Sequence, residues 1–345
     1  MISIVLDAMG SDDHPTPDVA GAVMAAREYG IRVILVGDEA VVRPALEALS
    51  PEPDLPIEIV HAPEVLTMDD KGEELVLKAR QRDAKNSMAV GMDLVKRGEA
   101  DAFVTAGNTG AALTTALFRM GRIRGVKRPA LAPLFPTATG FCLVLDIGAN
   151  PDVKPEYLLQ FGIMGSVYVE KALGIENPKV GLISNGEEEG KGNHLVKEAT
   201  PLFKEAAFNF YGNVEGKEVI GGVVDVAVTD GFTGNVMLKT SEAVAKLLTD
   251  KIKEAILNGG ALAKLGGLLI KPAMREVKAL LDPSRVGAAP LLGVDGLVFI
   301  GHGRSDAIAI RNGIRSAKEA VEANLLESIR DAIQLSLAKS RDQAV

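Results

Sequence analysis

The sequence predicts an α/β fold with a mainly parallel, doubly wound sheet. Short runs rich in Val, Ile and Leu alternate along the chain with segments of helical periodicity, which is the pattern of βαβ units. Five of these runs lead into a turn in which Gly stands beside Asn, Asp or Ser. Because the carboxyl ends of parallel strands meet at one edge of a sheet, we expect these turns to converge and to form a composite site.

The first third of the chain shows the alternation most clearly. We expect strands at residues 2–6, 31–37, 57–62 and 101–106. We expect helices at about residues 18–29, 39–49, 73–82 and 86–97. Further apolar strands run into polar turns within residues 141–150, 179–193, 223–235 and 297–310. No flexible linker interrupts the series, so residues 1–340 are expected to form a single α/β unit.

The composition excludes several classes of protein. The chain has 345 residues, 47% of them hydrophobic and 24% charged, as in ordinary globular proteins. A single cysteine, Cys142, excludes an intramolecular disulfide and a cysteine-cluster metal site, and its apolar strand predicts a core position. The N-terminus has no basic signal-peptide region and no run of 18 apolar residues occurs, so we expect a cytoplasmic location. The net charge of −8 argues against general nucleic-acid binding.

The turn DGFTGN, at residues 230–235, is the strongest candidate for a ligand site. It follows a Val-rich run that predicts a buried strand, and a helical pattern begins directly after it. A helix N-terminus favours an anion, since its free N–H groups and its dipole point toward the ligand. Asp230 alone could be an ordinary N-cap. The turn, however, supplies more polar groups than one cap needs, and they stand beside two glycines: Asp230, Thr233 and Asn235, with Gly231 and Gly234.

Two other turns have a structural and a functional interpretation of about equal weight. In GNTGA, Asn108 and Thr109 precede Gly110 at the start of a helical pattern, where they could bind a ligand or only cap the helix. In DIGAN, Asp146 and Asn150 follow an apolar strand, where an Asx turn is the structural alternative.

The stretch SNGEEEGKGN, at residues 184–193, fails the test for a nucleotide-binding P-loop. Only three residues separate Gly186 from Gly190, and Gly192 stands where that motif requires Ser or Thr. Lys191 and Asn193 still offer a cation and an amide to a smaller oxyanion. Its three glutamates are expected to form a solvated run. Because dinucleotide, serine-elbow and zinc-helix motifs are also missing, we expect no cofactor and no metal.

Two basic segments stand out in this acidic chain. Residues 246–285 carry eight basic and four acidic side chains, a local balance of +4, together with many leucines and isoleucines. Periodicity predicts a helical hairpin there, within residues 250–285, that packs against the body or a dimer mate; an amphipathic element at an anionic membrane is the alternative. A second island without acidic residues could dock an acidic partner or could be a solvated helix end: Arg119, Arg122, Arg124, Lys127 and Arg128.

In combination and in order, these turns resemble one family. The stretches DAMGSD, AGNTGA, DIGAN, NGEEEGKGN, DGFTGNV, GAAPLLGV and GHGRSDA are similar to the signatures of the bacterial phosphate acyltransferases of phospholipid synthesis. The resemblance covers about residues 2–335. It departs from the family pattern at Ser11, at residues 286–288 and at Arg304.

The resemblance implies reversible transfer of a fatty acyl group from acyl carrier protein to inorganic phosphate. It implies a fold similar to that of phosphate acetyltransferases and isocitrate/isopropylmalate dehydrogenases, and a cytosolic homodimer peripherally bound to the inner face of the membrane. An acyl-phosphate:glycerol-3-phosphate acyltransferase would take the product there. Phosphate is then the nucleophile. Lys191 and Asn193 would hold the phosphate and the oxyanion of the tetrahedral intermediate. Asp230 would orient Lys191 or accept a proton from phosphate, and His302 would serve the leaving thiolate.

Two alternatives remain at this point. The acyl donor could be coenzyme A, as for phosphate acetyltransferases. The chain could also be a non-catalytic regulator that binds the carrier protein at the membrane, although a regulator does not need Lys191, Asn193, Asp230 and Asn235.

Overall fold

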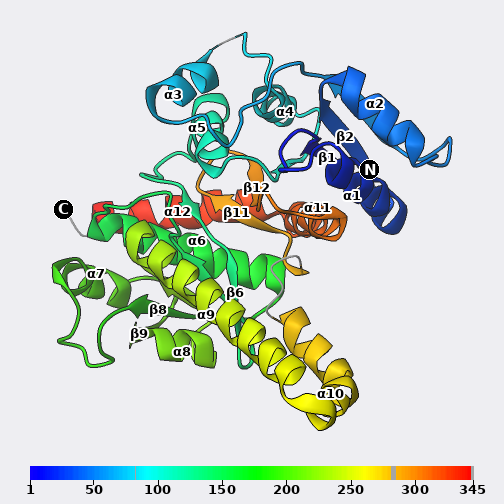
Figure 1. Cartoon of the computed structure of the whole chain (residues 1–345). Coiled ribbons are helices and arrows are strands. Elements are labelled where there is room, and N and C mark those ends of the chain that lie inside the picture. Colours follow the sequence, from blue (N-terminus) through cyan, green and yellow to red (C-terminus); the bar gives the residue numbers. More distant parts are fainter. Residues whose placement is uncertain (82, 281–284, 343–345) are drawn as a thin grey trace.

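The computed structural model describes residues 1–81, 83–280 and 285–342, and it confirms the mainly parallel α/β fold (Figure 1). The strands are β1 (Ser3–Asp7), β2 (Arg32–Gly37), β3 (Ile57–His61), β4 (Ala102–Thr105), β5 (Ala130–Leu131), β6 (Leu134–Thr137), β7 (Gly140–Leu145), β8 (Lys179–Ile183), β9 (Asn209–Val214), β10 (Val226–Val228), β11 (Ala288–Leu292) and β12 (Leu297–Gly301). The helices are α1 (Thr16–Tyr29), α2 (Glu39–Ala48), α3 (Gly72–Arg80), α4 (Ser87–Lys96), α5 (Thr109–Arg119), α6 (Pro155–Leu173), α7 (His194–Lys204), α8 (Gly216–Gly221), α9 (Gly231–Asn258), α10 (Gly260–Leu280), α11 (Ala307–Glu322) and α12 (Leu325–Asp342).

The strands divide into two sheets, which the order of the strands along the sequence did not reveal. The larger sheet has seven strands in the order β3-β2-β1-β4-β12-β11-β5, and the smaller has five in the order β6-β7-β10-β8-β9. The chain enters the smaller sheet after β5 and returns to the larger one with β11. Only tertiary contacts can reveal such a division, because strands of both sheets carry the same hydrophobic pattern.

The larger sheet is covered on both faces. Alternate residues of β1 point to opposite sides, so Ile4 and Leu6 belong to one buried cluster while Val5 belongs to another. The first cluster packs under α1 and α11, which contact each other, and the second packs under α4 and α5. The first cluster also continues into the smaller sheet through Leu143 and Phe161. One apolar core therefore connects the two sheets.

Four strands were not expected from the sequence: β5, β6, β9 and β11. Antiparallel pairing involves three of them, since β6 pairs with β7 and β11 pairs with both β12 and β5. Pro136 and Pro290 interrupt two of the runs, and Gly212 interrupts β9, so none shows a continuous β-branched pattern. They form because neighbouring strands supply hydrogen-bond partners.

A helical hairpin is present as α9 and α10, which pack together and extend away from the sheets (Figure 1). It begins earlier than the predicted residues 250–285, because α9 runs unbroken from Gly231. Gly267 lets the two helices approach closely, because a Cβ there would lie 2.3 Å from Cγ2 of Ile256. Residues 281–284, at the end of the predicted segment, lie outside the described residues. Among the described helices, none combines the length and apolarity that crossing a membrane requires.

Candidate active site

The DGFTGN turn is clamped against the DIGAN turn at the carboxyl edge of the smaller sheet. The amide of Gly231 donates to the carbonyl of Asn150 at 2.8 Å, and the amide of Gly148 donates to the carbonyl of Gly231 at 3.0 Å. A Cβ on Gly231 would lie 2.7 Å from that Asn150 carbonyl oxygen, and one on Gly234 would lie 2.0 Å from the Asp146 carbonyl oxygen. Both glycines are therefore required by the close approach of two backbones.

Asp146 and Asn150 act as structural braces for this clamp. The buried Asp146 carboxylate accepts hydrogen bonds from the amides of Leu131 and Asn150, at 3.0 and 2.6 Å, and from the Asn150 side chain at 2.9 Å. Asn150 also donates to the carbonyl of Pro129 at 2.7 Å. Burial raises the pKa of Asp146, and these hydrogen bonds oppose that effect. The structure thus agrees with the structural interpretation of Asp146 and Asn150, in which they form an Asx turn.

Asp230 caps α9, as its structural alternative predicted. One carboxylate oxygen accepts from the Thr233 amide and the other from the Thr233 hydroxyl, both at 2.8 Å. Asn235 is exposed one turn further along the helix, close to Gly148. The amides of Gly231, Thr233 and Gly234 are all bonded within the protein, so the exposed Asn235 side chain is the main polar group that the first turn of α9 offers.

The loop that carries Lys191 follows β8, the strand next to β10 in the smaller sheet. Strand β10 is paired in parallel with β7 on one side and β8 on the other, so the three loops that follow them lie side by side. Lys191 is exposed, and within the described residues its ammonium group makes no ion pair. Asn193 caps α7 by accepting a hydrogen bond from the Val196 amide at 3.0 Å, which leaves its amide group to face solvent or a ligand.

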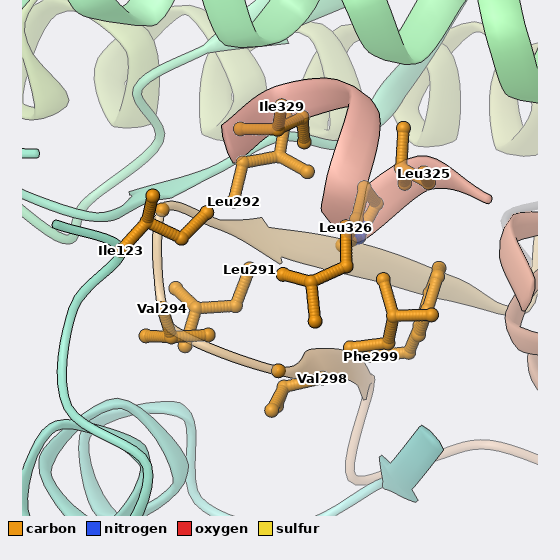
Figure 2. Close-up of a pocket in the computed structure, with 13 residues that line it drawn as sticks. Ile123, Leu291, Leu292, Val294, Val298, Phe299, Leu325, Leu326 and Ile329 are labelled. Atoms are coloured by element: carbon orange, nitrogen blue, oxygen red, sulfur yellow. The ribbon is translucent and has the colours of Figure 1, made fainter. Parts of the chain in front are cut away.

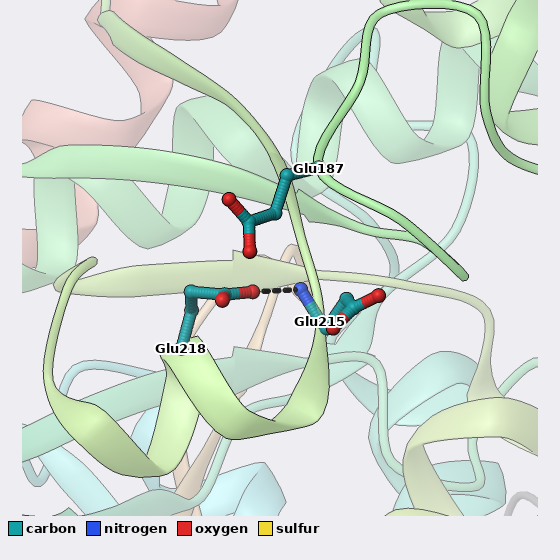
Figure 3. Close-up of side chains that lie close together, drawn as sticks. All are labelled: Glu187, Glu215 and Glu218. Carbon is teal, nitrogen blue, oxygen red and sulfur yellow. Dashed lines mark hydrogen bonds between the residues drawn. The ribbon is translucent and has the colours of Figure 1, made fainter.

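Two of the three glutamates of this loop pair with lysines other than Lys191. Glu187 pairs with Lys217 at 3.0 Å, and Glu189 pairs with Lys204. Glu187, Glu215 and Glu218 form an acidic cluster (Figure 3). The Lys217 ammonium lies 2.9 to 3.4 Å from an oxygen of each member and occupies the position that a cation would take. This cluster is therefore an ion-pair network.

The remaining candidate turns lie at the carboxyl edge of the larger sheet, after β1, β4 and β12. Asn108 caps α5 through the Ala111 amide and donates to the carbonyls of Thr67 and Asp70, so these hydrogen bonds all serve the fold. Thr109 and Gly110 are exposed beside it. His302 is exposed, and its Nδ1 accepts from the Arg304 amide at 3.2 Å.

Buried acids at this edge were missed by the sequence argument. Asp18 on α1 is fully buried and accepts from the Ser11 hydroxyl at 2.5 Å, while its other oxygen has no partner among the described residues. Burial raises the pKa of Asp18 to about 8. Asp7 is also buried, and Thr105 donates to it at 2.7 Å. Ser11 thus has a specific partner in Asp18 that only the fold reveals.

A pocket of about 620 Å³ lies between the two halves of the molecule, and we call it the cleft pocket. One wall is α5, from the half built on the larger sheet, and the other half contributes Ala149, Asn150 and Tyr157. Its apolar lining includes Leu113, Leu117, Phe118, Pro129 and Tyr157. Its polar lining consists of Thr114, Asn150, Arg122, Lys127 and Arg128. The volume is within the usual range for small-molecule sites.

A second cavity, between β11, β12 and α12, is lined by buried apolar side chains such as Leu291, Leu325 and Ile329 (Figure 2). Its volume is about 10 Å³, which is the lower limit for one water molecule. It is a packing gap and not a ligand site.

The basic island expected to dock a partner is divided by the fold. Arg122, Lys127 and Arg128 line the cleft pocket and are exposed. Arg119 has a side chain only 11% exposed and pairs with Asp93 at 3.0 Å, so it braces α5 against α4. Arg124 is exposed, and Gln334 on α12 donates to its carbonyl at 2.7 Å.

Comparison with known proteins agrees with this geometry. Residues 2–328 match the family described as "Fatty acid synthesis protein". A phosphate acyltransferase of Thermus thermophilus is 50% identical over 331 residues, which cover 96% of this chain and 98% of that protein. The phosphate acyltransferase of Elusimicrobium minutum is 47% identical over 332 residues, covering 96% and 95% respectively.

Solved structures share the fold at low sequence identity. The EutD phosphotransacetylase from Staphylococcus aureus matches with a TM-score of 0.59 and 17% identity, covering 93% of this chain and 94% of that one. A 4-hydroxythreonine-4-phosphate dehydrogenase from Klebsiella pneumoniae matches with a TM-score of 0.54 and 13% identity, covering 93% and 99%. The expected likeness to phosphate acetyltransferases is confirmed at the level of the fold. By its sequence, this chain belongs to the family of fatty acid synthesis proteins, whose members include the phosphate acyltransferases named above.

Proposed function

We propose that this phosphate acyltransferase transfers a fatty acyl group from acyl carrier protein to inorganic phosphate. One observation carries the proposal: the glycine turn at the start of α9 and the loop of Lys191 follow two adjacent parallel strands. A phosphate held between them would have the start of α9, with its dipole and the amide of Phe232, on one side and the Lys191 ammonium group on the other. We further propose that residues 1–340 work as one catalytic unit, since a single core joins both sheets.

The chemistry needs no acylated residue. A phosphate oxygen attacks the thioester carbonyl carbon, the C–S bond breaks, and the carrier's thiol leaves as a thiolate. Cys142 is buried and its thiol has a raised pKa because of that burial, so it offers no competing nucleophile. The protein supplies positioning and charge stabilisation, for which Lys191 and Asn193 are the proposed donors.

The other candidate residues take supporting parts in this proposal. The side chains of Asn235 and Thr109 would complete the phosphate cradle. Asp230 fixes Thr233 and the turn through both of its carboxylate oxygens, which favours a positioning role over proton transfer. His302 is exposed at the edge of the larger sheet and is the candidate proton donor to the leaving thiolate.

The proposed donor is an acidic carrier protein, and the exposed part of the basic island is its proposed dock. Arg122→Glu combined with Arg124→Glu should raise KM for the acyl carrier substrate and leave the melting temperature unchanged, because rim charges steer encounter. Since Arg119 is committed to Asp93, it is left out of the dock. An unchanged KM would remove this island from the model of docking.

The hairpin is the proposed contact with other surfaces. On α10, Leu262, Leu268 and Leu269 are 85%, 65% and 72% exposed, which is unusual for a helix face without a partner. Lys264 and Lys271 accompany them, so we propose that this helix lies on an anionic membrane, where an acyl-phosphate:glycerol-3-phosphate acyltransferase would receive the product. The exposed apolar residues of α9, such as Leu247 and Leu248, are the proposed homodimer contact.

One assay tests the proposed function against its alternatives. The protein is incubated with phosphate and either palmitoyl carrier protein or palmitoyl-coenzyme A, and acyl phosphate is measured by mass spectrometry. We expect product from the carrier substrate. Equal or faster turnover of the coenzyme A thioester would favour the other donor, and binding of the carrier without any product would favour a regulator.

A further inference from the structure

The loop between β8 and α7, at residues 184–193, carries Lys191 as an exposed side chain. An exposed lysine has a long flexible stem and loses conformational entropy when its ammonium group is held in one place. A donor stabilises the charge of a transition state best when it is already in position before the reaction. We therefore searched the loop for contacts that hold the backbone and the stem of Lys191.

The backbone of Lys191 is held by a buried side chain of the neighbouring strand. Asn213 on β9 is only 5% exposed, and its side-chain amide donates to the Glu188 carbonyl at 3.0 Å. The Lys191 amide donates to the same carbonyl at 2.9 Å. Asn213 lies opposite Leu182 in the register of β8 and β9, so this pair of hydrogen bonds connects the loop to the interior of the smaller sheet. The Lys191 backbone is thereby tied to the sheet.

The stem of Lys191 lies against Gly186, earlier in the same loop. Gly186 is buried, and a Cβ there would lie 2.8 Å from Cγ and 3.3 Å from Cβ of Lys191. The first carbons of the lysine thus occupy the space that a side chain at residue 186 would fill. Gly186 has no positive φ, so glycine is required there for space and not for backbone conformation. Alanine at this position would force Lys191 into another rotamer.

Further contacts close the loop and anchor it on both sides. The Asn185 side chain accepts a hydrogen bond from the Gly192 amide at 2.8 Å, which joins the two ends of the loop. The glutamate–lysine pairs described above tie the loop to α7 and α8. They also occupy two of the loop's carboxylates, so these acids do not compete with phosphate for the Lys191 ammonium group.

We propose that Gly186 and Asn213 are positioning residues that set the place of the Lys191 ammonium group for transfer to phosphate. Gly186 leaves room for the stem, and Asn213 fixes the backbone through the Glu188 carbonyl. Both act through Lys191 and not by contact with the substrate. This inference rests on the proposed function and deepens it, since it names the residues that hold the proposed phosphate-binding cation in place before the reaction.

The first test compares two glycines of the same loop. Gly186→Ala should lower kcat for acyl phosphate formation from palmitoyl carrier protein on the order of tenfold to a hundredfold, because a small displacement of a catalytic group has effects of that size. Gly190→Ala is the matched control, since no atom lies within 4 Å of its added Cβ, and it should keep the wild-type kcat. Equal kcat values for the two variants would overturn the inference.

A double-mutant cycle separates positioning from a structural role. If Gly186 acts only through Lys191, Gly186→Ala should change kcat by less than about twofold in the Lys191→Ala background. A general disturbance of the loop would instead lower kcat by the same factor in both backgrounds. That result would also overturn the inference.

Hydrogen exchange tests the Asn213 contact without turnover. In Asn213→Ala, the amides of residues 185–192 should exchange on the order of fivefold to tenfold faster, because the Glu188 carbonyl loses its fixed donor. Asn86→Ala removes a similarly buried asparagine, 2% exposed, which caps α4 in the other half of the molecule. This control should leave exchange in the loop unchanged. Unchanged exchange in Asn213→Ala would refute its assigned part.

The two measurements distinguish failure of this inference from failure of the proposed function. If the wild type forms no acyl phosphate from any donor while loop exchange responds to Asn213→Ala as expected, the proposed function alone is wrong. Normal turnover by Lys191→Ala would overturn both, because there would then be no catalytic cation to position.

Discussion

Substituting Gly234 with Ala tests whether the clamp between the two turns sets the site. The added methyl group would lie 2.0 Å from the carbonyl oxygen of Asp146, well inside van der Waals contact. The loop cannot yield freely, because the Asp146 carboxylate holds three hydrogen bonds of 3.0 Å or less. Overpacking typically costs about 1–3 kcal/mol, and this contact with backbone favours the upper end, about 3 kcal/mol.

The stability change can be measured by thermal unfolding. An entropy of unfolding of about 2.1 cal/mol/K per residue gives about 0.7 kcal/mol/K for a chain of 345 residues, so a loss of about 3 kcal/mol lowers Tm by about 4 °C. The catalytic rate should fall by more than the loss of folded protein explains, since α9 must move away from the loop and carry its N-terminal end with it. Differential scanning calorimetry and the acyl phosphate assay would be run on the same sample.

Gly266→Ala is the matched control. It is also a helical glycine, but no atom lies within 4 Å of its added Cβ. Since alanine is the better helix former by about 1 kcal/mol, this variant should be as stable as the wild type or more stable. If Gly234→Ala had the same Tm and activity as Gly266→Ala, the clamp would not be the constraint that we infer.

Three further predictions concern charge, pH and the hairpin. Lys191→Ala should lower kcat on the order of 10²-fold or more with Tm unchanged, because an oxyanion-stabilising donor is lost; near-normal turnover would exclude its assigned role. Asp18 has a folded pKa raised from 3.8 to about 8, so the folded state binds its proton more tightly and wild-type stability falls as pH rises from about 4 to 8. In urea unfolding, Asp18→Asn should therefore be about as stable as the wild type at pH 4 and more stable by up to a few kcal/mol at pH 8. Identical pH profiles of the two proteins would contradict the raised pKa of Asp18. Leu268→Glu with Leu269→Glu should abolish sedimentation with anionic vesicles, while Leu335→Glu, an equally exposed leucine on α12, should not; binding that survives the first pair would refute the membrane contact.

Local sequence was sufficient for the strand-to-turn units, because their information lies within a few residues. The run at 223–228 and the glycines at 231 and 234 predicted a strand, a tight turn and a helix, and the structure has β10 and α9 there. Asp230, Asn108 and Asn193 are helix caps, which their residue types allowed in advance. The ordered set of turns also indicated the family, which is confirmed.

Tertiary structure determined which polar side chains already have partners in the protein and which remain available to bind a ligand. Asp146 and Asn150 are committed to bracing the clamp, and Arg119 is committed to Asp93, because partners distant in sequence come within hydrogen-bonding distance. The two-sheet division and the burial of Asp18 depend on the same long-range packing. The sequence by itself thus determined the units and their chemical types. Only the packing of those units against each other decided which side chains are braces and which face the cleft, because burial and hydrogen-bond partners are properties of the whole fold.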